Sequence, residues 1–362
     1  MSRFNRGLPA LVALVCLTLA ACGGAPGSSG GGGGGSAVKL QGAGATFPNP
    51  LYQKWMSEYG KAHPEVMIDY QSIGSGGGIQ QITARTVDFG ASDKPMSDDE
   101  LKAAQGELLH IPTVLGAVVI TYNLPDLKDP LKFSPGTIAD IYLGKIKRWD
   151  DAAIKSDNPG VNLPGADITV VHRSDGSGTS AVFTDYLSKV SPEWKEKVGA
   201  GASPNWPVGQ GGKGNEGVTG AVKQQPDTIG YVELAYAVQN KLPVAQVKNA
   251  SGNFVTPSFD SVTAAAAESL ASTPDDLRVS ITNAGGASAY PISSYTYILA
   301  YKDQKDAAKG KALVDYLWWA IHDGEGFAKD LQYAPLPPEI VKRDEAKINS
   351  ITSGGKPLHG AS

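Results

Sequence analysis

The sequence predicts an α/β protein built from two lobes. Short β-type runs alternate with helical patterns along the chain, as they do in α/β folds. Residues 38–362 exceed the length of one typical domain, so we expect two lobes. The clearest β-type runs are residues 116–122, 168–171, 229–232 and 295–300.

Two glycine-rich turns near the start of this region each precede a predicted helix. Residues 42–48 lead into an amphipathic helix, while residues 73–78 follow the strand-like run 66–70 and open another. The first backbone N–H groups of a helix have no partner inside the helix. The apolar positions are Leu51, Tyr52, Trp55 and Tyr59 in the first helix, and Ile79 and Ile82 in the second.

A third turn, residues 173–179, is the most informative stretch of the chain. It reads Arg-Ser-Asp-Gly-Ser-Gly-Thr and joins the β-type run 168–171 to a helix expected to start at about Ser180. A polar turn at a helix start favours an anion, because free N–H groups and the helix dipole both point at it. Three turns of this kind suggest helix starts that converge on one anion.

The side chains of the third turn add to this prediction. Ser177 and Thr179 supply hydroxyl donors, and Gly178 allows close approach of the backbone. Arg173 supplies a forked guanidinium, which Asp175 can hold in place. Taken alone, the motif fits equally well a serine-rich helix cap beside a surface ion pair.

The rest of the chain carries no recognisable catalytic motif. Residues 264–267 and 307–321 read as helices. Residues 38–362 contain no Gly-x-Ser-x-Gly elbow and no Walker loop, and the five histidines lack metal-ligand spacing. Successive side chains of a strand point to opposite faces, so His172 should point away from its neighbour Arg173, and we assign it a structural role. We therefore expect no catalytic residue, no metal and no cofactor.

The N-terminal region predicts export and lipidation. Residues 1–21 read as a signal peptide, and Leu19-Ala20-Ala21-Cys22 resembles a bacterial lipobox, with Cys22 as the acylated residue. The alternatives are a plain signal peptide or a short signal anchor. Residues 22–37 then form the lipidated cysteine and a Gly/Ser-rich tether.

The cysteine count indicates what stabilises the folded region, and the net charge indicates which partners it can have. The two cysteines, Cys16 and Cys22, both precede the folded region, so its stability must come from its core and not from disulfides. Loss of Arg3 and Arg6 with the signal, which contains no acid, takes the formal charge from −4 to −6. A negative chain argues against nucleic acid as a partner, and any anion affinity must come from locally oriented donors.

Several ordered motifs along residues 38–362 resemble the phosphate-binding proteins, the substrate-binding lipoproteins of bacterial phosphate-specific ABC transporters. The resemblance implies a class II periplasmic-binding-protein fold, in which two α/β lobes are joined by a two-segment hinge and the ligand lies in the cleft. The motifs that carry it are residues 42–48, 87–93, 140–146, 149–151, 175–180, 211–215 and 229–233.

The resemblance also implies a set of phosphate ligands. Asp175 falls on the position that pairs with the arginine, and Gly76 stands where a second serine is usual. That departure matters little, because the family's ligand is the first serine, here Ser75. The implied ligands are Thr46, Phe47, Ser75, Asp93, Arg173, Ser177, Gly178 and Thr179.

The chemistry of a carboxylate gives a separate argument for the role of Asp93. A carboxylate that faces an anion is repulsive unless the anion carries a proton, in which case the carboxylate accepts a hydrogen bond. Phosphate has that proton and sulfate at neutral pH does not, so a site built around this bond rejects sulfate by roughly 10⁴–10⁵. The alternative is that Asp93 caps a turn beside Lys94; the resemblance favours the ligand role.

Together these observations predict an extracytoplasmic receptor that binds inorganic phosphate and delivers it to an ABC permease. We expect a monomer, anchored by lipid in the periplasm or on the outer face of the cell membrane, and not an enzyme. The alternatives are an exported phosphatase, a sulfate- or molybdate-type oxyanion receptor, and a surface protein that has lost transport.

The order of the predicted site residues suggests how the chain passes between lobes. We expect residues 38–114 and 286–362 in lobe 1 and residues 115–285 in lobe 2. Residues 110–113 and 284–287 are then the two hinge strands, where small residues and a proline can absorb a rotation.

Overall fold

The computed structural model describes residues 37–127 and 129–360. The predicted signal peptide, Cys22 and the tether up to residue 36 lie outside the described residues. In the described part of the chain, no helix combines the length and apolar character needed to cross a membrane.

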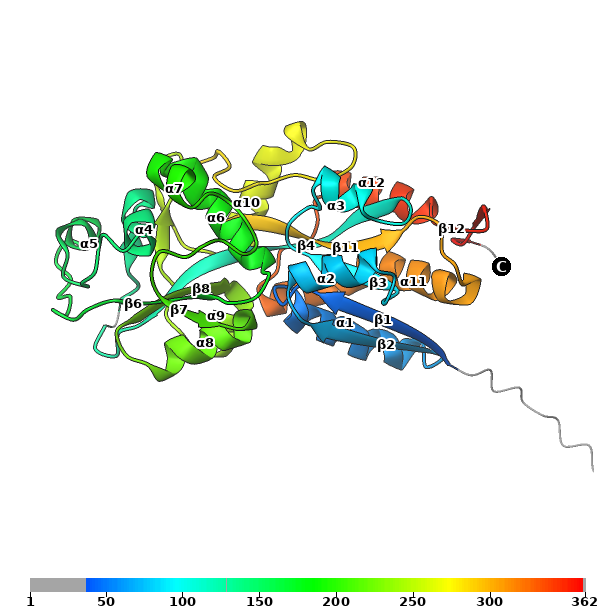
Figure 1. The fold of residues 1–362 in the computed structure, drawn as a ribbon, viewed down its shortest axis with the longest axis horizontal. Helices are drawn as coiled ribbons and strands as arrows, with labels where there is room; N and C mark the ends of the chain where they lie inside the picture. The colour runs from blue at the N-terminus through cyan, green and yellow to red at the C-terminus, as the bar shows by residue number, and fades with distance from the viewer. Residues whose placement is uncertain (1–36, 128, 361–362) are drawn as a thin grey trace, which may run out of the picture. The chain divides into compact units, whose positions relative to one another are not determined.

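One eight-stranded mixed sheet forms the centre of the molecule (Figure 1). Its strand order is β2-β1-β3-β11-β4-β8-β6-β7. The strands β1, β2 and β3 are parallel to one another, as are β6, β7 and β8, and β11 and β4 run antiparallel to their neighbours. The bounds are β1 Val38–Gly44, β2 Val66–Ser72, β3 Phe89–Ser92, β4 Leu108–Asn123, β6 Thr169–Arg173, β7 Gln210–Gly212, β8 Thr228–Glu233 and β11 Ser293–Tyr301.

The long strand β4 joins two halves of this sheet. Its residues 108–117 pair with β11, whereas residues 118–123 pair with β8. We call the strands β1, β2, β3 and β11 with their helices the first half, and β6, β7 and β8 with theirs the second half. Two small sheets complete the strands: β5 Lys132–Phe133, β9 Gln246–Lys248 and β10 Phe254–Val255 in one, and β12 Thr352–Ser353 and β13 Lys356–Pro357 in the other.

Helices cover both faces of the sheet. Figure 1 shows α6 and α7 on one side of the second half and α8 and α9 on the other. The helices are α1 Asn49–Ala62, α2 Ser75–Thr83, α3 Asp98–Lys102, α4 Pro135–Tyr142, α5 Ala152–Asp157, α6 Gly178–Val190, α7 Pro192–Lys197, α8 Gly214–Gln224, α9 Leu234–Gln239, α10 Phe259–Ser269, α11 Ala307–Ala320 and α12 Pro338–Asn349. Short 3₁₀ turns lie at η1 Leu270–Ser272, η2 Asp323–Phe327 and η3 Lys329–Leu331.

These elements confirm the predicted α/β architecture and the helices that follow the three turns. The apolar positions expected to face the core in α1 and α2 are buried. The helix α6 begins at Gly178 and not at Ser180, because the Ser177 hydroxyl accepts a hydrogen bond from the Ser180 N–H and caps the helix earlier (3.0 Å).

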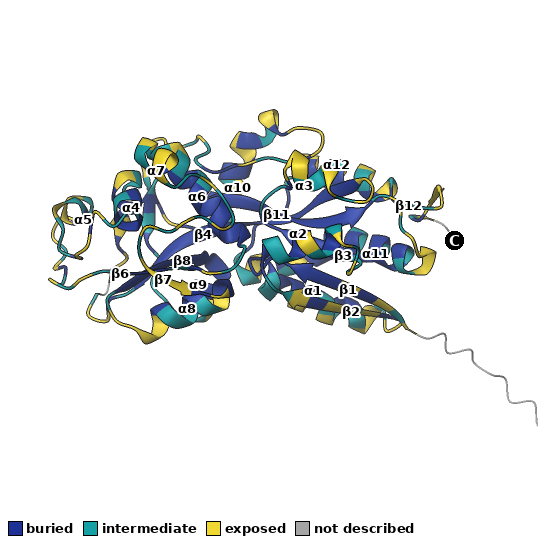
Figure 2. Cartoon of the chain, viewed as in Figure 1, coloured by how far each residue is buried: buried dark blue, intermediate teal, exposed yellow. Residues whose placement is uncertain are grey.

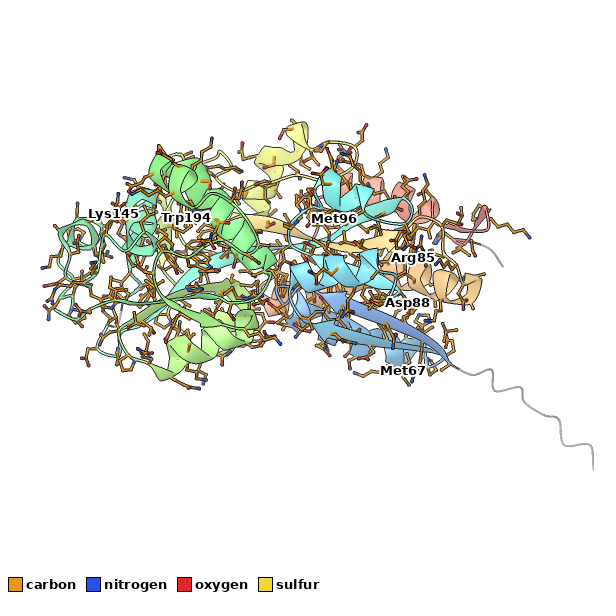
Figure 3. The ribbon with its side chains drawn as sticks, viewed as in Figure 1. Met67, Arg85, Asp88, Met96, Lys145 and Trp194 are labelled. Carbon is orange, nitrogen blue, oxygen red and sulfur yellow. The ribbon has the colours of Figure 1, made fainter. Side chains whose placement is uncertain are left out.

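The core follows the sheet and the inner faces of its helices (Figure 2). Its largest fully buried side chains are aromatic and include Trp55, Trp149 and Trp194. On the second half, Lys145 in the loop after α4 pairs with Glu193 of α7, next to the fully buried Trp194 (Figure 3). A domain without disulfides must be stabilised mainly by the burial of side chains in a core of this kind.

A second stretch of chain runs along the border of the two halves. Arg278 donates to the Met96 carbonyl (3.1 Å) and to Asp98 of α3 (2.8 Å) in the first half. Lys189 of α6, in the second half, donates to the Thr282 hydroxyl (2.7 Å). The lobe boundaries and hinge segments expected from the sequence stay a prediction, although residues 110–113 lie within the part of β4 that still pairs with β11.

Candidate functional site

The starts of α2 and α6, one from each half, lie in contact. The Ser75 hydroxyl at the start of α2 lies 3.3 Å from a carboxyl oxygen of Asp93. A Cβ atom added to Gly178 at the start of α6 would clash with this same hydroxyl and with the Asp93 carboxyl. Nearby, the Gly76 N–H donates to the Gly176 carbonyl across the border (2.9 Å). Only glycine therefore lets the two helix starts approach this closely.

Arg173 is held by a two-pronged ion pair. Its side chain is almost fully buried and donates from Nε to one oxygen of Asp175 (2.8 Å) and from a terminal nitrogen to the other (2.5 Å). Its other terminal nitrogen donates to the Thr179 hydroxyl (3.1 Å). Burial would raise the pKa of Asp175, but the hydrogen bonds and charge of Arg173, with the Gly214 N–H, outweigh burial and lower it. The pair places a fixed cation beside the start of α6.

Asp93 is a buried carboxyl that follows β3. One of its oxygens accepts from the Thr296 hydroxyl of β11 (2.8 Å), which is adjacent because Ser92 pairs with Tyr297. Burial raises the pKa of Asp93 to about 7, even though hydrogen bonds from Thr296 and Ser75 and the charge of Arg173 act to lower it. Near neutral pH the group can therefore act as an acceptor or carry a proton.

The site presents backbone donors that the protein itself does not use. Among the residues that the structure describes, no acceptor lies within hydrogen-bond reach of these N–H groups, which precede or begin α1, α2 and α6. Buried backbone N–H groups are nearly always paired, so this cluster is suited to a ligand with several acceptor atoms. The groups are the N–H of Thr46, Phe47, Ser75, Gly178 and Thr179.

Two tyrosines hold the backbone of the first turn. Tyr236 of α9 donates to the Thr46 carbonyl (2.6 Å), and Tyr333 donates to the Phe47 carbonyl (2.6 Å). Because the Thr46 carbonyl and the Phe47 N–H belong to one peptide group, the bond from Tyr236 also fixes the direction of that N–H. These tyrosines position the predicted donors and were not among the residues expected from the sequence.

Asn215 is a further residue that the sequence analysis did not assign. It is fully buried at the start of α8, and its amide nitrogen donates to the hydroxyls of Thr46 (2.8 Å) and Thr179 (3.1 Å). Its signal in the sequence is its place at the end of the motif 211–215, which contributed to the resemblance without a role for any single residue.

The structure brings the predicted phosphate ligands and Asp175 into one connected cluster. A chain of contacts runs from Thr46 through Asn215 and Thr179 to Arg173 and Asp175. A second set joins Ser75 and Asp93 to Gly178, which follows the capping residue Ser177. Phe47 adjoins Thr46 in the chain. Their roles as ligands stay a prediction.

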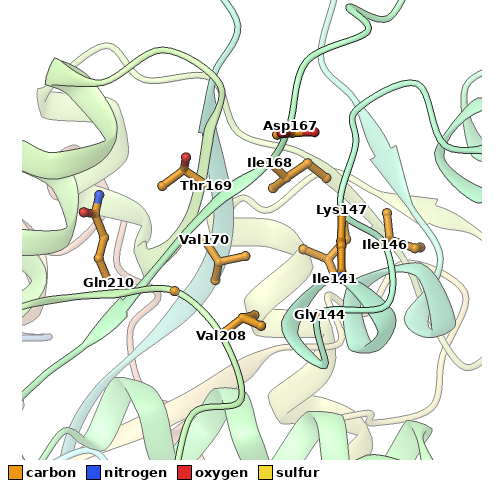
Figure 4. A pocket seen from close by; sticks show the side chains of 11 residues that line it. Ile141, Gly144, Ile146, Lys147, Asp167, Ile168, Thr169, Val170, Val208 and Gln210 are labelled. Atoms are coloured by element: carbon orange, nitrogen blue, oxygen red, sulfur yellow. The ribbon is translucent and has the colours of Figure 1, made fainter.

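Other features lie apart from this cluster. His172 stacks on Trp206 and faces away from the guanidinium of its neighbour, in line with a structural role. A pocket of about 440 Å³ on the second half, lined by Ile141, Val170 and Val208 among others, contains none of the predicted site residues (Figure 4). Within residues 37–127 and 129–360, no group of three His, Cys, Asp or Glu side chains is placed to hold a metal ion.

Comparison with known proteins gives consistent matches. A family model described as the PBP superfamily domain matches residues 28–318. Phosphate-binding protein PstS of Xylella fastidiosa (strain 9a5c) is 50% identical over 311 residues, covering 86% of this chain and 85% of that protein. Phosphate-binding protein PstS of Pasteurella multocida (strain Pm70) is 48% identical over 325 residues, covering 89% and 94%.

Solved structures share the fold. A periplasmic phosphate-binding protein (PfluDING) bound with phosphate superposes with a TM-score of 0.67 at 21% identity, covering 85% of this chain and 93% of that one. At this level of identity the similarity concerns the fold, and it confirms the predicted periplasmic-binding-protein architecture.

Proposed function

The chain belongs to the PstS family of phosphate-binding proteins within the PBP superfamily, and from that premise we propose that its buried cluster of donors holds inorganic phosphate. The protein is a phosphate receptor of an ABC transporter and not an enzyme. The observation that carries the assignment of the site is the meeting of the starts of α2 and α6 at one buried carboxyl, Asp93.

The proposed site matches the chemistry of a partly protonated tetrahedral anion. Unpaired backbone N–H groups and the hydroxyls of Ser75, Ser177 and Thr179 supply donors to the phosphate oxygens. Arg173 donates in addition, and its charge is largely balanced by Asp175. Most of the negative charge of the ligand is then stabilised by oriented dipoles, which a buried site makes stronger than water would.

Asp93 supplies the acceptor in this arrangement. A phosphate O–H placed against the carboxyl oxygen that also contacts the Ser75 hydroxyl gives a hydrogen bond, whereas a fully deprotonated sulfate would place oxygen against oxygen in a desolvated site. The geometry therefore favours phosphate over sulfate or molybdate.

The cellular setting follows from the family and from the N-terminal sequence. The protein is an extracytoplasmic receptor. We add that Cys22 carries the lipid anchor, that residues 23–37 act as the tether, that the folded domain is a monomer, and that it delivers phosphate to a membrane permease. The lipobox-like sequence before Cys22 supports the anchor.

Calorimetric titration of the phosphate-stripped soluble domain tests the proposed function. We expect tight binding of phosphate and arsenate, which both carry the proton that Asp93 accepts, and weak or no binding of sulfate. Equal affinities for phosphate and sulfate would contradict the proposed site, and release of phosphate from a chromogenic ester would contradict the assignment as a receptor.

A further inference from the structure

The hydrogen-bond partners of Asn215 determine the orientation of its side-chain amide. Its side-chain oxygen accepts from the Glu233 N–H (2.9 Å). Because a backbone N–H can only donate, this contact determines which end of the amide is oxygen and which is nitrogen. The amide nitrogen must then face Thr46 and Thr179, where it donates to both hydroxyl oxygens.

These contacts decide the direction in which both threonine hydroxyls point. A hydroxyl oxygen has two lone pairs and one hydrogen. The Thr179 oxygen accepts from Arg173 (3.1 Å) and from Asn215 (3.1 Å), and the Thr46 oxygen accepts from the Asn215 backbone N–H (3.2 Å) and its side chain (2.8 Å). With both lone pairs engaged, each hydroxyl has only its hydrogen left to offer.

We infer that Asn215 is a positioning residue that converts Thr46 and Thr179 into obligatory hydrogen-bond donors towards the bound anion. This inference rests on the proposed function of the site. Without Asn215 each hydroxyl is free to rotate and present a lone pair to the anion. With it, the site is set for an acceptor-rich ligand before the ligand arrives.

The same residue links the two halves of the molecule. Thr179 and Asn215 belong to the second half, whereas Thr46 precedes α1 in the first half. The Thr46 hydroxyl is therefore directed only when the halves are in contact, so its contribution to binding depends on their contact.

Substitutions of Asn215 in two backgrounds test the inference. Phosphate affinity is measured calorimetrically for Asn215→Ala in the wild-type chain and in a chain carrying Thr46→Val and Thr179→Val, which lack both hydroxyls. One net hydrogen bond corresponds to roughly a fivefold change in affinity, so we expect a loss of roughly 25-fold in the wild-type background. In the valine background the loss should be less than about fivefold, because no hydroxyl remains to be directed.

Asn215→Asp gives a second variant that keeps the shape and the contact with the Glu233 N–H. Its second oxygen accepts from the threonines in place of donating to them, so the hydroxyls turn towards the new carboxylate. The added negative charge weakens phosphate binding in both backgrounds and cancels in the comparison. We expect the two valine substitutions to weaken binding strongly in the wild-type chain and much less in Asn215→Asp.

A matched control separates this role from general stability. Asn158 is likewise buried in the second half and makes a similar set of bonds, to the Lys132 backbone (2.8 Å) and the Ile154 carbonyl (2.9 Å), away from the site. Asn158→Ala should lower the thermal unfolding midpoint without changing phosphate affinity.

The outcomes are distinct. A loss for Asn215→Ala that is the same in both backgrounds, or an affinity equal to that of the wild type, overturns the positioning role. Absence of phosphate binding by the wild-type chain overturns the proposed function, and the inference with it.

Discussion

At the scale of single residues, Asp93 has the greatest influence on which anion the site accepts. Replacing it with asparagine keeps the shape and adds a donor that sulfate can use. We expect Asp93→Asn to reduce the ratio of sulfate to phosphate dissociation constants by roughly tenfold or more, with a smaller loss of phosphate affinity. Paired calorimetric titrations measure this ratio, and an unchanged value would show that Asp93 does not accept the ligand proton.

The raised pKa of Asp93 also gives the ligand-free protein a pH dependence. In the folded state the group keeps its proton to about pH 7, whereas in the unfolded chain it ionises near its ordinary value of 3.8. Between these values the folded state binds more protons, so stability falls as pH rises. Asp93→Asn should remove this contribution and gain stability relative to the wild type from pH 4 to pH 7. Unfolding midpoints across this range, without phosphate, test the direction.

Arg173 and Asp175 are expected to act as a unit. Arg173→Ala should weaken phosphate binding more than Ser177→Ala, because charged hydrogen bonds are worth roughly 1.5–3 kcal/mol against about 1 for neutral ones. It also leaves the Asp175 carboxylate uncompensated beside the anion. Adding Asp175→Asn should therefore recover part of the loss. A larger effect from Ser177→Ala would reverse this ranking.

The predicted ligands of the candidate site could be identified from the sequence better than the residues that position them. Ser177, Gly178 and Thr179 form a local turn, so their roles follow from adjacent residues. Asn215, Tyr236 and Tyr333 contact the site only because distant elements meet there. The motif 211–215 marks Asn215 without indicating its role, and nothing in the local sequence distinguishes the two tyrosines from ordinary core residues.

At the scale of elements, the close approach of two helix starts depends on Gly178. An added methyl group must displace Ser75 or Asp93, and overpacking of this kind costs about 1–3 kcal/mol. We expect Gly178→Ala to weaken phosphate binding by about 5- to 150-fold. Gly220→Ala in α8 is the matched control, because a Cβ there meets no atom within 4 Å, and its affinity should equal that of the wild type. If the two variants bind alike, the helix starts do not need this contact.

Strand β4 shows why element lengths were harder to predict. The sequence indicated a strand over residues 116–122, yet β4 extends over Leu108–Asn123. Proline usually interrupts an internal strand, and Pro112 made the earlier part look like a hinge. In the structure the register with β11 shifts between Thr296 and Tyr297, and Pro112 lies at this irregular point of the ladder. The regular hydrogen bonding is already interrupted there, so the missing N–H of proline is tolerated.

At the scale of the whole molecule, the path of the chain between the halves depends on long-range pairing. The partner of β4 changes from β11 to β8 between Ala117 and Val118, further along the strand than the expected hinge. Strand pairing of this kind joins residues far apart in the sequence, so it cannot be predicted from local composition. The alternation of strands and helices, by contrast, is local and predicted the fold class.

The contacts across the border give the last prediction. Gly76 meets Gly176, Asn215 meets Thr46, and the Tyr333 hydroxyl, which donates to the Phe47 carbonyl, lies 3.1 Å from a carboxyl oxygen of Glu233, so the two halves are in contact around the site. A ligand that touches both halves binds this arrangement better than a separated one and shifts the population towards it. We therefore expect the phosphate-stripped domain to contract when phosphate is added, as measured by its radius of gyration in small-angle scattering. Sulfate at equal ionic strength should leave the radius unchanged, and so should phosphate added to Arg173→Ala below its dissociation constant. Identical radii for the stripped and loaded wild-type domain would contradict closure, and binding would then occur in a preformed cleft.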